Sequence, residues 1–83
     1  MIQTKPDVVV TEVFFDEKKV FFSLQDGRII GAPLEWYPKL RNASANERDD
    51  YEIAPSGYGV HWPSIDEDIS AVGMLDYRMV VRK

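Results

Sequence analysis

The residues best suited to chemistry are gathered in one stretch, GVHWPSIDEDIS, at positions 59–70. It holds the only histidine of the chain, His61, beside Trp62, and a run of three acidic residues follows. A histidine titrates near neutral pH, and carboxylates can orient it or bind a divalent cation. The stretch therefore suggests three hypotheses: an acid–base pair, a metal site, or a strand that ends at a proline before a helix.

The acidic run, Asp66 to Asp68, lacks the spacing of a calcium loop, which distributes its oxygen ligands over more positions around an internal glycine. Acidic side chains are favourable in the first turn of a helix, where they accept hydrogen bonds from free amides. We therefore interpret the run as the entry to a last helix and assign no metal ligands and no cofactor. Ser44 and Ser70 fit helix caps better than nucleophiles, and the chain has one histidine, so we predict no catalytic residues and no enzymatic activity.

Alternation along YGVHW places His61 on the side of the strand opposite Val60 and Trp62. If Val60 and Trp62 face the core, His61 lies at the surface or over a helix, and a functional role would require an acidic partner such as Asp66 or Glu67. In a domain this small, Trp36 and Trp62 are expected in the core with their N–H groups bonded at its margin. If they are exposed instead, they form a binding platform. The candidate interaction residues are Trp36, His61, Trp62, Asp66, Glu67 and Asp68.

The 83 residues predict a single domain over 1–83, and a 45% hydrophobic content is typical of a folded globule. Cysteine is absent, which excludes disulfides and thiolate metal sites. We find no signal peptide and no apolar run long enough to span a membrane, so we expect a cytoplasmic protein. The net charge of −4 argues against direct nucleic-acid binding, and the one basic cluster is the tail at 76–83.

The order of expected elements predicts an α+β fold with a small antiparallel sheet. Alternating apolar residues and an Asp26-Gly27 turn predict a three-stranded meander within the first 31 residues. A helical segment follows over 32–43, interrupted or begun late because of Pro38. Ser44 and Glu47 have the spacing of a capping box at the start of a second short helix over 45–50. Two further short strands, 51–54 and 58–62, precede a loop and a short last helix within 64–75.

Several of these segments together resemble a small bacterial family, domain-of-unknown-function family 2442. The resemblance covers about residues 8–75 and rests on PLEWYPKLRNAS, ERDDYEI and GYGVHWPSIDEDISAVGML. It implies a compact α+β domain without established catalytic residues. Some members carry a helix-turn-helix domain after this one, for which residues 76–83 are too few. Others are encoded beside another small protein, in an arrangement similar to toxin–antitoxin pairs.

From these observations we expect a non-enzymatic interaction or regulatory module that binds a protein encoded nearby, in an antitoxin-like role. One alternative is a divalent-metal or small-ligand domain that uses His61 and the run Asp66–Asp68. Another is an accessory domain of a DNA-binding regulator. Partner binding or self-association is expected at an edge strand, 8–15, because it carries a single charge in eight residues. Strict alternation would place Thr11 and Val13 together on the side facing the partner.

Overall fold

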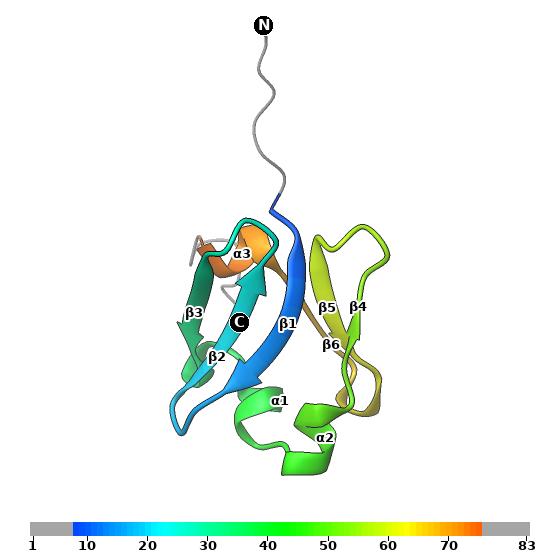
Figure 1. Cartoon of the computed structure of the whole chain (residues 1–83). Helices are drawn as coiled ribbons and strands as arrows, with labels where there is room; N and C mark the ends of the chain where they lie inside the picture. Colours follow the sequence, from blue (N-terminus) through cyan, green and yellow to red (C-terminus); the bar gives the residue numbers. More distant parts are fainter. Residues whose placement is uncertain (1–7, 76–83) are drawn as a thin grey trace, which may run out of the picture.

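The computed structural model describes residues 8–75, which form two three-stranded antiparallel sheets with a shared core and short helices at both ends (Figure 1). This confirms the α+β fold class. Sheet A has the order β1 (Val10–Phe15), β2 (Lys19–Leu24), β3 (Ile29–Pro33), and sheet B has the order β4 (Glu52–Ile53), β5 (Gly59–Trp62), β6 (Glu67–Ser70). The connection between the sheets holds η1 (Leu34–Trp36), α1 (Pro38–Arg41) and α2 (Ala45–Asp49), while η2 (Pro63–Ile65) links β5 to β6 and α3 (Ala71–Leu75) follows β6.

Sheet A confirms the predicted meander. Alternate residues of β2 are buried, as the sequence pattern predicts for a strand with one face on the core. The turn to β3 is tight because Gly27 adopts a φ of +95°, which glycine takes without steric cost. Asp26 completes the turn by accepting hydrogen bonds from the Arg28 amide at 3.0 Å and from Arg28 Nε at 2.8 Å.

A β-bulge interrupts the alternation of β1. The pairing with β2 shifts by one residue between Val10 and Glu12, so Thr11 is an extra residue on this strand. Thr11 and Glu12 are both exposed, and Val13 returns to the core at 7% exposure. The expectation that Thr11 and Val13 share a face is therefore wrong, because alternation holds only in a strand of regular register.

The connecting helices are short because proline and a capping box divide them. Pro38 lies at the first position of α1, where a missing N–H costs nothing, and the preceding residues form the separate turn η1. The predicted capping box begins α2: the Glu47 amide donates to Ser44 Oγ at 3.1 Å, and the Ser44 amide donates to Glu47 Oε1 at 2.9 Å.

Sheet B contains one strand more than predicted. Residues Glu67–Ser70, which we expected in a loop or helix entry, form β6 and pair with β5. The acidic run therefore does not begin the last helix, and α3 starts only at Ala71. The hairpin between β5 and β6 is possible because Asp66 takes a left-handed conformation at a φ of +54°, a region that aspartate tolerates better than most residues.

Trp62 lies at the centre of the core where the two sheets meet. Its indole is fully buried, stacks near Phe22 of β2 and meets the edge of Phe15 from β1. Its N–H donates to the Arg48 carbonyl at 3.0 Å, which confirms the expected core tryptophan with a bonded N–H. The Arg48 side chain ties the two connecting helices together, since it donates to backbone carbonyls at the end of α1.

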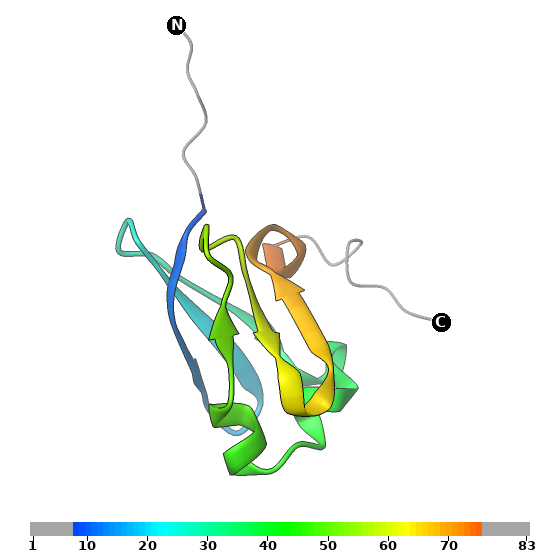
Figure 2. The ribbon, with the colours of Figure 1, turned by 90° about the vertical axis from the view of Figure 1, so that its right-hand side faces the viewer.

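The expected docking edge, β1, is an edge of sheet A, but β4 lies beside it (Figures 1 and 2). The Val10 amide donates to the Gly57 carbonyl at 2.7 Å, so part of this edge is engaged by the β4–β5 turn. Among residues 8–75, no helix has the length and apolar character to cross a membrane. The basic tail, 76–83, lies outside the described residues.

Candidate functional site

A row of polar side chains crosses the outer face of sheet B. His61 at the centre of β5 pairs in register with Glu52 on β4 and with Asp68 on β6. Paired residues of neighbouring strands project to the same face, so the imidazole has an acidic residue on each side. Alternation correctly places His61 on the face opposite the buried Val60 and Trp62.

His61 and Asp68 are predicted site residues whose side chains are in direct contact. His61 Nδ1 lies 2.7 Å from Asp68 Oδ1, and the two side chains are 40% and 75% exposed. An ionised carboxylate only accepts hydrogen bonds, so the proton of this contact belongs to Nδ1. Asp68 thus orients the ring and leaves Nε2 as the second polar atom of the imidazole.

A shallow hollow of about 350 Å³ lies beside this pair on the same face of sheet B. Its floor includes residues with small side chains, Ala54, Gly59 and Ser70. Tyr58, which is 63% exposed, lines it together with the His61–Asp68 pair. The hollow forms because small residues of β5 and β6 lie next to Ala54, which directly follows β4, with larger residues beside them.

The rest of the acidic run does not converge on His61. Asp66 is exposed in the hairpin turn, and its carbonyl accepts a hydrogen bond from Lys39 Nζ at 2.9 Å. Glu67 points inward and is 4% exposed, since it pairs with the buried Trp62 across the strands. Within residues 8–75, no group of three or more His, Asp or Glu side chains is arranged to hold a metal ion.

The two tryptophans do not form a joint platform on this face. Trp62 is buried, and Trp36 is half-buried in η1, with its ring 6.4 Å from that of Tyr37. The predicted candidates therefore separate into the exposed pair His61 and Asp68, the turn residue Asp66, and three residues that contribute to or border the core.

The hydroxyl of Ser70 lines the hollow but acts as a helix cap. Ser70 Oγ accepts a hydrogen bond from the Gly73 amide at 2.8 Å. The serine therefore satisfies a free amide at the start of α3, as expected for a cap. Together with the exposed His61–Asp68 contact, this arrangement offers hydrogen-bond acceptors and an aromatic ring for binding.

Sequence reasoning missed Glu52 and Tyr58. Their residue types carry no motif, and they lie six or more residues apart from each other and from Asp68 along the chain. The signal that could have found Glu52 is the register of the β4–β5 hairpin, because an Ala54-to-Gly59 turn places position 52 opposite position 61.

Three comparisons place the chain among known proteins. The family model of a protein of unknown function (DUF2442) matches residues 10–79. A crystal structure of a protein of unknown function from Rhodospirillum rubrum is similar with a TM-score of 0.75 and 25% identity, covering 94% of this chain and 95% of that one. A solution structure of an uncharacterized protein from Chromobacterium violaceum is similar with a TM-score of 0.70 and 26% identity, covering 86% of this chain and 67% of that one. No curated protein matches the chain.

Proposed function

The chain belongs to the DUF2442 family of proteins of unknown function, and from its surface chemistry we propose that it is a non-enzymatic interaction module of the bacterial cytoplasm. In this proposal the outer face of sheet B binds a basic protein, and a lysine or arginine side chain of that partner enters the hollow beside His61 and Asp68. The partner is the product of a neighbouring gene, and the role is antitoxin-like.

The observation that carries the proposal is the unequal distribution of charge. Residues 44–75, here called the sheet B half, contain seven Asp and Glu residues and one basic residue, Arg48. Residues 8–43, here called the sheet A half, contain five acidic and five basic residues. The Arg48 guanidinium is bound to α1 carbonyls, so it does not lie among the acids of the outer face. An acidic face attracts and orients a basic partner.

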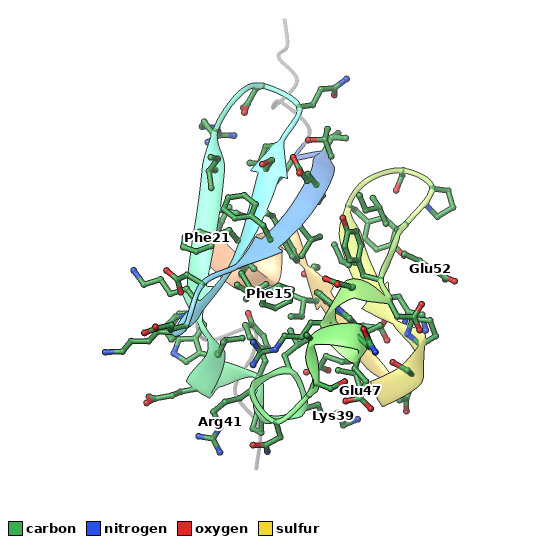
Figure 3. The ribbon with its side chains drawn as sticks, turned by 60° about the horizontal axis from the view of Figure 1, so that its bottom comes forward. Phe15, Phe21, Lys39, Arg41, Glu47 and Glu52 are labelled. Atoms are coloured by element: carbon green, nitrogen blue, oxygen red, sulfur yellow. The ribbon has the colours of Figure 1, made fainter. Side chains whose placement is uncertain are left out.

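The hollow has the chemistry that a cationic side chain requires. The carboxylate of Asp68 borders it, and Glu52 stands on the neighbouring strand, on the far side of His61. Tyr58 offers an exposed ring, over which a guanidinium or ammonium group is attracted by the π-electrons. The small side chains of the floor leave space for the aliphatic stem of such a residue. Figure 3 shows Glu52 on β4 at the surface, on a different side of the molecule from Phe21 of sheet A.

The test is binding of the purified protein to the product of its adjacent gene, followed by calorimetry at low and high salt. The variant Glu52→Gln/Asp68→Asn should weaken binding about three- to tenfold, because two exposed charge pairs are lost. The matched control Glu17→Gln/Glu35→Gln removes the same charge from the sheet A half and should change affinity less than twofold.

Higher salt should weaken binding of the wild type more than binding of the Glu52→Gln/Asp68→Asn variant. The proposal is contradicted if the neighbouring product does not bind, or if both double variants weaken binding equally. Equal losses would mean that the net charge of the protein attracts the partner and that the partner does not bind the outer face of sheet B.

A further inference from the structure

The outer face of sheet A is a second candidate surface, separate from sheet B. Its central row crosses the three strands through Phe14, Phe21 and Gly31, which are paired in register. The two rings stack with centroids 5.0 Å apart and an angle of 15° between their planes. A Cβ atom on Gly31 would lie 2.8 Å from the Phe21 ring, so this ring covers the glycine backbone. The result is a flat aromatic surface.

This surface is exposed in the described part of the molecule. Phe14 is 37% exposed, and Ile29, in the next row, is 58% exposed. In Figures 1 and 2 the described helices and sheet B all lie on the other side of sheet A. Figure 3 shows Phe21 on the outer side and Phe15 on the side of the helices.

The charges around the aromatic row are self-complementary. Glu12 lies at one end of the face, in the row of Ser23 and Ile29, and Lys19 lies at the other end, opposite Pro33. A two-fold axis along the aromatic row would stack two copies face to face. It would bring the Glu12 end of one copy over the Lys19 end of the other, twice in each dimer.

We propose that the outer face of sheet A is a homodimer interface, in which the Phe14–Phe21 row of one copy packs on the same row of a second copy. The charge of the two halves favours a second copy as the occupant. The sheet A half has equal numbers of acidic and basic residues, whereas two sheet B halves would repel each other.

The dimer should be weak and reversible. Three strands about 4.8 Å apart form a face of a few hundred Å², which is below the roughly 800 Å² per partner of a standard stable interface. We therefore expect dimerisation only at high micromolar concentration or above. A dimer of this geometry leaves both sheet B faces outside, so it is compatible with partner binding there but does not depend on it.

The first test is sedimentation equilibrium of the isolated protein up to about 1 mM. The wild type should show a concentration-dependent mass between monomer and dimer. Ile29→Lys should reduce the association constant at least tenfold, because it places two ammonium groups in the apolar interface of each dimer. The matched control Tyr58→Lys changes a similarly exposed side chain on the other half and should leave the constant within twofold of the wild type.

The second test is a charge exchange, with folding of each variant checked by circular dichroism. Glu12→Lys and Lys19→Glu should each weaken the dimer about three- to tenfold, and the combined variant should recover most of the loss. The proposal is overturned if the wild type stays monomeric throughout, as it would if another segment covered the face. It is also overturned if Tyr58→Lys abolishes association as strongly as Ile29→Lys, or if the charge exchange gives no recovery.

Discussion

The two sheets share one core, yet their outer faces have opposite chemistry. Sheet A has strands of five or six residues, an aromatic row on its outer face and equal numbers of positive and negative residues in its half of the chain. Sheet B has strands of two to four residues and presents Glu52, His61 and Asp68 to solvent. The buried residues determine how the sheets pack. The outward-facing residues do not take part in this packing, so the two outer faces can bind by two different kinds of contact.

The buried residues, unlike the outer faces, do not divide into two groups. Fully buried side chains come from both sheets and from the connecting helices, so neither half has a core of its own. Their packing should make the two halves unfold together, because a domain of this size has little stability to divide. The surface contrast is therefore a difference in binding chemistry within one cooperative unit.

The largest expected effect tests this cooperativity. Trp62→Ala should lower the free energy of unfolding by about 3–5 kcal/mol, because it leaves a cavity between the sheets and removes the hydrogen bond to the Arg48 carbonyl. That loss is comparable to the whole stability of a small domain. Urea denaturation followed by circular dichroism measures it, with the half-buried Trp36→Ala as the control of smaller effect. If NMR showed sheet A intact while sheet B was unfolded, the halves would be separate units.

A smaller loss of stability is expected when the glycine of either turn, Gly27 or Gly57, is replaced by alanine. Gly27→Ala in sheet A should cost about 1 kcal/mol, because the φ of +95° is unfavourable for alanine although its Cβ would meet nothing within 4 Å. Gly57→Ala in sheet B should cost about 2–3 kcal/mol, because a Cβ there would also lie 2.5 Å from Val9 Cγ1. Thermal and chemical denaturation of both variants give the difference. Equal costs would show that Val9 moves aside freely and that the β1 edge is loosely held by this turn.

The smallest effect concerns acid stability of the sheet A turns. Hydrogen bonds from the Arg28 amide and side chain lower the pKa of Asp26 in the folded state, and the Lys18 and Lys19 amides lower that of Asp16. A lowered folded pKa stabilises the fold above the usual aspartate pKa of about 4, and this contribution is lost as the pH falls through the folded value. Asp26→Asn should therefore be less stable than the wild type at pH 7 and equally stable near pH 2. Urea midpoints at both pH values measure this; a difference that persisted at pH 2 would exclude the carboxylate charge as its cause.

Local signals in the sequence were sufficient for much of the fold. Alternation in β2, the Asp26-Gly27 turn and the Ser44–Glu47 capping box each act over a few neighbouring residues, and the structure confirms all three. The same alternation correctly places Trp62 inside and His61 outside. These elements are predictable because the residues that determine them are adjacent in the chain.

The parts that were not predicted depend on pairing between distant residues. Strand β6 begins with a buried glutamate in an acidic run, which resembles a helix entry, and only its ladder with β5 makes it a strand. For the same reason the partner of His61 is Asp68, since the β5–β6 register brings those two positions together and turns Glu67 inward. The hollow likewise requires Ala54, Gly59 and Ser70, which come from separate parts of the chain.

The bulge in β1 has a consequence for how this chain can vary in length. Two exposed residues, Thr11 and Glu12, separate the buried Val10 and Val13, whereas a regular strand would have one exposed residue between them. Loss of Thr11 would restore a regular ladder and keep Val10 and Val13 inside, whereas loss of a residue outside the bulge would turn the following side chains of the β1–β2 ladder to the opposite face. Homologous chains can therefore lack a residue at position 11 while their core side chains stay buried. An alignment gap there would leave the fold unchanged.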